Sequence, residues 1–308
     1  MSQPVITVGV ITYNSSKYIV ETLESIKAQT YPHLILQISD DCSTDGTVEI
    51  CERWIEKNRA RFVKTKIIVA EHNTGVSANA NRNWDACETL WLKEIAGDDL
   101  LLPGCIEDNT RYVTEHPEAV VVFSRVRPFR VLFGKKVWNE ESWHDYSFFN
   151  LTPDEQYHYL IYEGNHLPAA PCFYNIPKLR KIGIRHDERI PLLEDYPKWV
   201  TLARKGVTFS FLDKHTVGYR LNNNSLSIGL YSPQFYKSNL LFYLYYYQDE
   251  IKEEKDRDDI YNLMCDEALK FYTKTYSFIK ESSEYKLGHS LLRPFRFCKR
   301  LINYLCIS

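Results

Sequence analysis

The stretch "VITVGVITYNSSKYIVETLESIKAQTYPHLILQISDD", residues 5–41, decides the fold class. Residues 5–13 form a β-branched apolar run that is typical of a buried parallel strand, and residues 33–39 form another. Between them, Ile19, Leu23 and Ile26 recur at helical spacing. The stretch therefore predicts a strand, a helix and a second strand parallel to the first.

The same alternation continues to about residue 125, with helices expected at 48–57 and 76–88 and strands at 64–72 and 89–96. We expect an α/β fold with a Rossmann-like, mostly parallel sheet flanked by helices. Ligands of such sheets bind at the carboxyl ends of the strands. The polar residues that fall at these ends are Tyr13 and Asn14, Asp40 and Asp41, and Asp98 and Asp99.

The rest of the chain is less regular. Residues 126–138 resemble a pair of strands, residues 153–163 and 193–206 resemble helices, and residues 207–220 alternate like a strand. A stretch of turn residues at 221–229 marks a boundary, and the chain beyond it is aromatic and helical.

Composition excludes several classes of protein. The 308 residues carry a net charge of -2, which gives no basic face for nucleic acid. The eight cysteines have no metal-ligand spacing and indicate reduced thiols. The N-terminus does not resemble a signal peptide, and no stretch approaches the roughly 20 apolar residues that cross a bilayer. We therefore expect a cytoplasmic protein that binds no nucleic acid.

Six stretches together resemble the inverting family 2 glycosyltransferases with the GT-A fold, of the type that builds bacterial surface polysaccharides. They appear in the family's order and spacing: "VGVITYNSSKYIVETLESIKAQTY", "ISDDCSTDGT", "NTGVSANANRN", "AGDDLLLP", "LLEDYPKWVTLARKG" and "YRLNNNSLS". The resemblance runs from residue 5 to about residue 227. It implies transfer of a sugar from a nucleotide-sugar donor to a glycan or lipid-linked acceptor, with inversion.

The resemblance also implies roles in donor binding. The loop after the first strand flanks the base and ribose, and the "NANRN" segment faces the nucleotide side of the pocket. Asp41 accepts a hydrogen bond from the base, and because a carboxylate only accepts, it fits the N3–H of uracil or thymine. A UDP- or dTDP-sugar is therefore expected. The remaining residues assigned to this group are Thr12, Tyr13, Asn14, Asn81 and Arg82.

The pair in "AGDDLLLP" matches the motif that holds Mn²⁺ or Mg²⁺ against the diphosphate in this family, and hard divalent cations prefer carboxylate and phosphate oxygens. Asp99 is the expected metal ligand, as a solvent-facing loop carboxylate. Asp98 is expected to reach the ribose or to ligate through water. Many relatives have a histidine shortly after the Tyr-Arg pair, where this chain has Asn222, a weaker ligand.

The "ED" of "LLEDYPKW" matches the family's catalytic pair. Asp195 is expected to be the general base, and Glu194 is expected to bind or orient the acceptor. Both stand at the start of a predicted helix, and we expect its backbone N–H groups and dipole to keep Asp195 ionised.

The resemblance divides the chain into a nucleotide-sugar-binding half at 1–125, an acceptor-binding half at 126–227 and a helical region at 228–308. Two alternatives remain open at this point. A nucleotidyltransferase shares a similar nucleotide-binding half but usually carries a glycine-rich signature after the first strand, which "ITYNSSKYI" lacks. A catalytically silent scaffold that binds nucleotide or carbohydrate would keep the fold without needing a carboxylate at Asp195.

The segment "LLRPFRFCKRLINYL", residues 291–305, is basic and amphipathic. Such a segment can lie on the anionic inner face of a membrane, which would suit a lipid-linked acceptor. Packing of the same helix on its own domain is the alternative.

Overall fold

The structure is a computed structural model that describes residues 3–139, 146–221, 233–247 and 254–281 of the chain. The chain divides into two compact units, residues 1–223 and 224–308. The predicted boundary segment around Asn222 and the basic segment 291–305 lie outside the described residues. Among the described residues, no helix combines the length and the apolar character needed to cross a bilayer.

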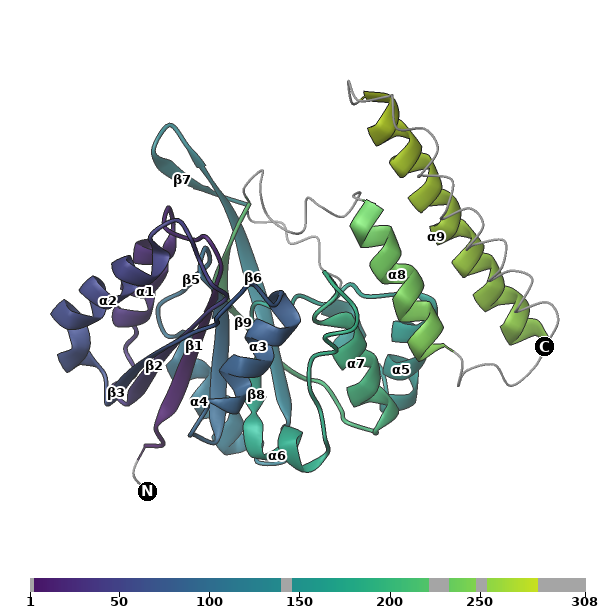
Figure 1. Cartoon of the computed structure of the whole chain (residues 1–308). Helices are drawn as coiled ribbons and strands as arrows, with labels where there is room; N and C mark the ends of the chain where they lie inside the picture. Colours follow the sequence, from purple (N-terminus) through teal and green to yellow (C-terminus); the bar gives the residue numbers. More distant parts are fainter. Residues whose placement is uncertain (1–2, 140–145, 222–232, 248–253, 282–308) are drawn as a thin grey trace. The chain divides into compact units, whose positions relative to one another are not determined.

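The first unit is built on one nine-stranded sheet with the order β3-β2-β1-β4-β8-β6-β9-β5, and β7 pairs with β6 (Figure 1). The strands of this sheet are β1 (Ile6–Thr12), β2 (Leu34–Asp40), β3 (Lys64–Val69), β4 (Trp91–Ala96), β5 (Leu100–Leu101), β6 (Val121–Leu132), β7 (Lys135–Trp138), β8 (Phe173–Asn175) and β9 (Ser210–Arg220). Strands β3, β2, β1 and β4 pair in parallel, as the sequence predicts. Antiparallel pairing joins β8 to both β4 and β6. The sheet is thus parallel from β1 to β4 and mixed in the rest.

Helices cover both faces of the sheet. They are α1 (Ile19–Lys27), α2 (Thr47–Asn58), α3 (Val76–Asp85), α4 (Cys105–Glu115), α5 (Pro153–Tyr162), α6 (Ile176–Lys181) and α7 (Tyr196–Arg204), with short 3₁₀ turns at Arg59–Arg61 and Tyr146–Asn150. The expected helix end at Gly206 is confirmed, because Gly206 has φ +72° and follows the last turn of α7.

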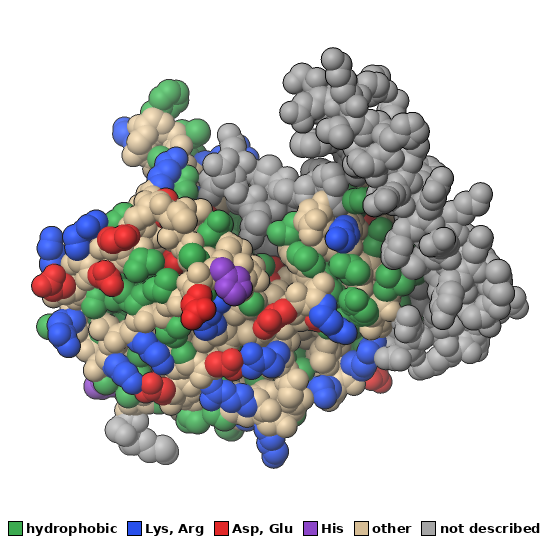
Figure 2. All heavy atoms as spheres, viewed as in Figure 1, with side chains coloured by type: hydrophobic (Ala, Val, Ile, Leu, Met, Phe, Trp, Pro, Cys, Tyr) green, Lys and Arg blue, Asp and Glu red, His purple; other side chains and the backbone are tan. Residues whose placement is uncertain are grey.

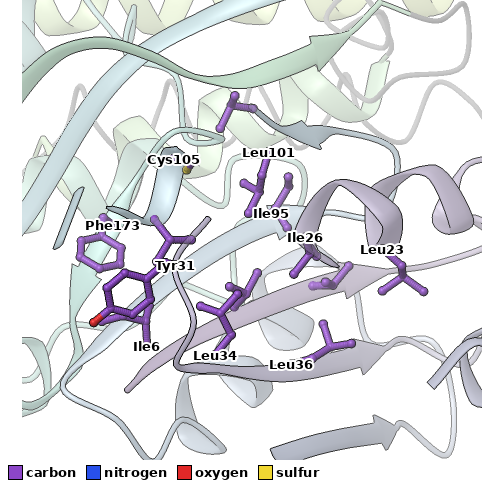
Figure 3. Packing of buried hydrophobic residues seen from close by; sticks show 14 of the residues in the cluster. Ile6, Leu23, Ile26, Tyr31, Leu34, Leu36, Ile95, Leu101, Cys105 and Phe173 are labelled. Carbon is purple, nitrogen blue, oxygen red and sulfur yellow. The ribbon is translucent and has the colours of Figure 1, made fainter. Parts of the chain in front are cut away.

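The alternation of side chains along β1 separates the two faces. Residues Ile6 and Val8 lie in the main hydrophobic core, where Leu23 and Ile26 of α1 also pack (Figure 3). Gly9 points to the other face, where a Cβ atom would lie 2.4 Å from Nδ2 of Asn83 in α3. The absence of a side chain at this position therefore allows α3 to approach the sheet closely.

The second unit contains α8 (Pro233–Tyr246) and α9 (Glu254–Glu281), which pack against each other. Phe242 and Tyr247 are buried there, and Asn239 Nδ2 donates to Glu267 Oε2 at 2.9 Å. The residues described in this unit are mostly helical, as the sequence predicts.

Candidate functional site

Three loops meet at the carboxyl edge of the parallel strands. Thr12 pairs with Asp40 across β1 and β2, and Ile11 pairs with Ala96 across β1 and β4. The pairing continues into the loops, since Asp41 N–H donates to the Thr12 carbonyl and Gly97 N–H donates to the Ile11 carbonyl, each at 2.9 Å. The three polar clusters predicted from the sequence are therefore brought to one edge.

Asp40 holds the loop after β2 together. Its carboxylate accepts the Thr12 hydroxyl at 2.5 Å and the Ser43 backbone N–H at 2.7 Å. Thr12 is 3% exposed, and its hydroxyl is committed to this bond. The Thr12 side chain therefore joins two strand ends, because the register places it opposite Asp40, and its place beside the base stays a prediction.

Tyr13 and Asn14 follow at the rim. Tyr13 is 49% exposed, so its ring is available to a ligand at this edge. Asn14 has φ +50°, a backbone conformation that asparagine tolerates better than most residues. Its side-chain oxygen accepts the Thr44 N–H at 2.9 Å, and its own N–H donates to the Ser43 hydroxyl at 2.8 Å. Asn14 thus ties the first loop to the second.

Asp41 is the centre of a second cluster. It is 2% exposed, and its carboxylate accepts the Thr74 hydroxyl at 2.5 Å and the Gly75 N–H at 2.7 Å. The Arg82 guanidinium forms an ion pair with it at 3.2 Å, the longest of these contacts, and also donates to the Thr74 hydroxyl at 2.7 Å. Asp41 and Arg82, which are separated by forty residues of sequence, therefore lie together.

Asn79, which the sequence interpretation missed, joins this cluster. Its Nδ2 donates to the Thr12 carbonyl at 3.1 Å, and its Oδ1 accepts Ser39 Oγ at 2.6 Å and Arg82 at 2.9 Å. The sequence spacing could have indicated this position, because residues three apart lie on the same face of a helix and Asn79 precedes Arg82 by three.

The Asn81 side chain faces another direction, and the hydrogen bonds that it makes argue against its predicted place on the nucleotide side. Its Nδ2 donates to the His186 carbonyl at 3.0 Å and to Glu188 Oε1 at 2.7 Å, and its Oδ1 accepts the His186 N–H at 3.0 Å. The reason is helical geometry, since Asn81 is two residues from Asn79 and so lies about 200° around the helix. Asn81 anchors the segment that leads to Glu194.

Asp99 is buried, at 3% exposure, and the expectation of a solvent-facing loop carboxylate is wrong. Its Oδ1 accepts the backbone N–H of Arg220 at 2.8 Å, because the pairing of β5 with β9 lays the end of β9 over it. Arg220 Nε also donates to the Asp98 carbonyl at 2.6 Å. Burial and then the neighbouring Asp98 carboxylate raise the pKa of Asp99 well above its usual value.

The arginine that covers this pair is itself fixed. Arg220 is 3% exposed, forms an ion pair with Glu21 of α1, and lies over the rings of Tyr18 and Phe129. Ion pairs with Arg220 and Lys136 counteract the burial of Glu21 and leave its pKa below the usual value. The last residue of β9 therefore connects the aspartate pair to α1.

Asp195 is the N-cap of α7. Its Oδ1 accepts the Tyr196 N–H at 2.7 Å, and its Oδ2 accepts Asn165 Nδ2 at 3.0 Å. These bonds and Lys198 favour the carboxylate, but burial outweighs them and raises the pKa of Asp195. The sequence predicts that the helix N-terminus favours the ionised form of Asp195, and burial acts against this effect because it withdraws the carboxyl from water. Burial and the adjacent Asp195 also raise the pKa of Glu194 to about 7.

A buried lysine and histidine lie behind this pair. Lys198 is 1% exposed, and its Nζ lies 3.0 Å from the Tyr174 hydroxyl and 3.4 Å from His186 Nε2. His186 Nδ1 lies 2.8 Å from the Glu194 carbonyl. Because a carbonyl only accepts, Nδ1 carries the proton and Nε2 presents its lone pair to Lys198. Burial and Lys198 lower the pKa of His186 well below its usual value, so this neutral form is maintained.

The sequence interpretation missed both residues, although a signal existed for one. Lys198 precedes Leu202 by four positions and so lies on the core-facing stripe of α7. Its ammonium lies over the rings of Trp84 and Trp199, at 5.3 and 4.3 Å from their centres. The aromatic rings and His186 thus hold a cation beneath the turn that carries Glu194 and Asp195.

Comparison with known proteins identifies the family. A model described as "Glycosyl transferase family 2" matches residues 7–170, more than half of the chain. The chain belongs to this family. The transferase is 25% identical over 227 residues to TuaG of Bacillus subtilis (strain 168), whose name assigns it as a glycosyltransferase of teichuronic acid biosynthesis, with 73% of this chain and 82% of TuaG covered.

Two further likenesses concern one protein of Staphylococcus aureus. The transferase is 30% identical over 119 residues to the poly(ribitol-phosphate) beta-N-acetylglucosaminyltransferase TarS (strain Mu50 / ATCC 700699), covering 38% of this chain and 20% of TarS. The crystal structure of S. aureus TarS 1–349 in complex with UDP-GlcNAc superposes with a TM-score of 0.61 at 22% identity, covering 92% of this chain and 76% of that one. The predicted GT-A fold is thereby confirmed, and the enzyme is a glycosyltransferase.

The aspartate pair fits a divalent cation by the chemistry of its donors. Asp98 and Asp99 place two carboxylates side by side after β4, and a hard cation takes such oxygens together with phosphate and water. One oxygen of Asp99 already accepts the Arg220 N–H. Within the described residues, no group of three or more His, Cys, Asp or Glu side chains is placed to hold a metal. Oxygens of the diphosphate and water are ligands that such a cation would also accept.

Proposed function

We propose that this enzyme transfers a sugar from a UDP- or dTDP-sugar to a glycan or lipid-linked acceptor, with inversion at the anomeric carbon and with the assistance of Mn²⁺ or Mg²⁺. The observation that carries the proposal is the edge of the sheet where Tyr13, Asp41 with Arg82, and Asp98 with Asp99 meet. It offers an exposed ring, a carboxylate acceptor and a pair of acids, which are the groups that a base, a ribose and a metal-bound diphosphate need.

Donor binding is proposed to start at Tyr13 and Asp41. The exposed Tyr13 ring contacts the base, and Asp41 accepts the base N3–H. Four donor groups from Thr74, Gly75 and Arg82 already bind the Asp41 carboxylate, so one of these hydrogen bonds must break when the base N3–H binds. We infer that Arg82 releases Asp41, because its 3.2 Å contact with Asp41 is the longest of these contacts and its guanidinium can then donate to the diphosphate.

The aspartate pair is proposed to serve the diphosphate. Asp99 is the metal ligand, and Asp98, the less buried of the two, reaches the ribose or ligates through water. A bound Mn²⁺ or Mg²⁺ would supply neutralisation of the charge on the departing nucleoside diphosphate. Arg220 keeps Asp99 in place through its backbone N–H.

Asp195 is proposed to be the general base. Its carboxylate removes the proton from the acceptor hydroxyl, the hydroxyl oxygen bonds to the anomeric carbon, and the bond from that carbon to the diphosphate oxygen breaks. Attack opposite the leaving group inverts the configuration. The pKa of Asp195, raised by burial, makes its carboxylate a stronger base than an exposed aspartate. Glu194 is proposed to bind or orient the acceptor.

The names of the relatives guide the choice of substrates. TarS is named as an N-acetylglucosaminyltransferase and its 1–349 structure contains UDP-GlcNAc, so this donor is the first to test. TuaG and TarS are named for teichuronic acid and poly(ribitol-phosphate), so a cell-surface polymer is the proposed class of acceptor. A cytoplasmic location, at the inner face of the membrane, would suit a lipid-linked form of such an acceptor.

The test is a screen of donor hydrolysis across common sugar nucleotides with and without Mn²⁺, followed by NMR of the sugar product formed from the active donor. We expect hydrolysis of a UDP- or dTDP-sugar and a product of inverted anomeric configuration. A retained configuration would refute the mechanism. Release of pyrophosphate from a nucleoside triphosphate would indicate a nucleotidyltransferase. Absence of hydrolysis and of any thermal shift with UDP, dTDP or GDP would indicate a scaffold.

A further inference from the structure

The hairpin of β6 and β7 projects from the first unit (Figure 1). The two strands pair from Phe129 with Trp138 to Leu132 with Lys135, which leaves Phe133 and Gly134 as a two-residue turn. Both turn residues have positive φ, +49° and +75°, as the tight turns of twisted hairpins require. The tip is thus a defined structure.

This hairpin exposes apolar side chains on a convex surface. Val131 is 48% exposed, Leu132 49% and Val137 50%, and Phe133 is fully exposed. Figure 2 shows hydrophobic side chains at the end of the projection. Scattered apolar residues are normal on a surface, but four exposed ones within seven positions, on both faces of one hairpin tip, are concentrated enough to indicate an interaction site.

Basic side chains surround these apolar residues. Arg130, Lys135 and Lys136 are exposed, and residues 126–138 contain no acidic residue. Lys136 forms an ion pair with Glu21, and its Nζ lies 5.9 Å from the centre of the Phe129 ring, so its side chain reaches from the tip back to the base of the hairpin. Figure 2 shows Lys and Arg side chains beside the apolar end. The partner of this tip must therefore accept apolar side chains and carry negative charge.

We propose that the hairpin tip, residues 130–137, docks on a membrane surface that contains anionic lipid. Leu132 and Phe133 enter the boundary between headgroups and acyl chains, and Arg130 and Lys135 lie against the anionic headgroups. A fluid bilayer receives a narrow convex tip without a preformed pocket, whereas a protein partner would need a groove that matches it. The absence of acids on the hairpin fits a uniformly anionic surface better than a protein surface of mixed charge.

The pairing of the strands links the tip to the candidate site. Strand β6 is antiparallel to β8, which is antiparallel to β4, so β6 leaves the sheet at the edge where β4 ends. Phe129, at the base of the hairpin, pairs with Arg220, whose N–H donates to Asp99. A membrane at the tip would therefore face the edge that carries the aspartates. The further step, that this brings a lipid-linked acceptor to the site, rests on the proposed function.

The first experiment places a probe at the tip of the full-length chain. Phe133→Trp adds one tryptophan to the six of the wild-type chain. Quenching of tryptophan fluorescence by brominated lipid is measured as the difference between the variant and the wild-type protein. Val63→Trp is the matched control, since Val63 is 59% exposed and precedes β3 at the opposite edge of the sheet. We expect quenching at position 133 alone, with vesicles of phosphatidylcholine and phosphatidylglycerol and not with phosphatidylcholine alone. Equal quenching of both probes, or quenching of neither, would overturn the proposal.

The second experiment measures affinity for the same vesicles. Phe133→Ser combined with Lys135→Glu should weaken binding by about tenfold or more, since it removes one apolar side chain and reverses one cation at the interface. Donor hydrolysis should not change, so failure of this proposal is distinguishable from failure of the proposed function. Unchanged affinity in this variant, with binding lost on removal of residues 291–305, would assign the contact to the C-terminal segment and overturn the proposal.

Discussion

Replacement of Asp195 by asparagine separates catalysis from stability at the most informative position of the site. Asn is as good an N-cap as Asp, so the bond from the Tyr196 N–H to Oδ1 should persist. The bond from Asn165 Nδ2 should be lost, because the new amide nitrogen cannot accept it. Asn165 cannot reverse its amide without losing another bond, since its Oδ1 accepts the Leu167 N–H at 3.0 Å.

The magnitudes follow from these contacts. One lost hydrogen bond costs about 1 kcal/mol, and removal of a negative charge next to Glu194 offsets part of this cost. We expect the melting temperature of Asp195→Asn to fall by no more than about 2–4 °C. Transfer should fall by roughly 10²-fold or more, about 2.7 kcal/mol in the barrier, because the general base is lost.

The assay compares initial rates of transfer, affinity for UDP and melting temperature in three proteins. Asp195→Ala is the control that also loses the cap and should cost about 1 kcal/mol more in stability than Asp195→Asn. The wild-type rate should rise with pH through the elevated pKa of Asp195, since only the carboxylate accepts a proton. Transfer by Asp195→Asn within tenfold of wild type, or an unchanged acid limb in its pH profile, would refute the assignment.

Three other substitutions test neighbouring parts of the site. Asp99→Asn keeps an acceptor for the Arg220 N–H and removes the charge, so the fold should persist while stimulation by Mn²⁺ disappears; equal stimulation would exclude Asp99 as a ligand. The melting temperature of Glu194→Gln should increase relative to that of wild type as the pH rises from 4.5 through about 7. The reason is that the wild-type fold favours protonated Glu194 and loses this stabilisation when Glu194 is deprotonated. A difference in melting temperature that does not change with pH would contradict the raised pKa. Arg82→Ala should weaken UDP binding by roughly tenfold. Asn81→Ala should leave UDP binding unchanged and lower the free energy of unfolding by about 1–2 kcal/mol. Calorimetry in which Asn81→Ala weakens UDP binding and Arg82→Ala does not would place Asn81 at the nucleotide.

The regular features of this protein were accessible to sequence interpretation because they are local. The alternation of apolar strands with helical spacing predicted β1, α1, β2, α2, β3, α3 and β4, and parallel pairing then required their polar ends to share one edge. The position of Glu194 and Asp195 at the start of a helix, and the end of that helix before Gly206, also followed from local signals, acidic residues and a glycine.

The surroundings of the same residues depended on contacts between distant segments. The sequence showed that Asp99 follows a strand, but β9, 121 residues later, buries it under Arg220. Asn79 and Asn81 are the same residue type, and the sequence does not distinguish them. The packing of α3 decides that Asn79 faces Arg82 and Asn81 faces His186. Burial, which only the tertiary structure sets, raises the pKa of Asp195 against the effect expected of the helix N-terminus. Local patterns thus determined which elements form and where their polar ends lie, whereas desolvation and hydrogen bonding across the sheet determined the charge and the direction of each side chain.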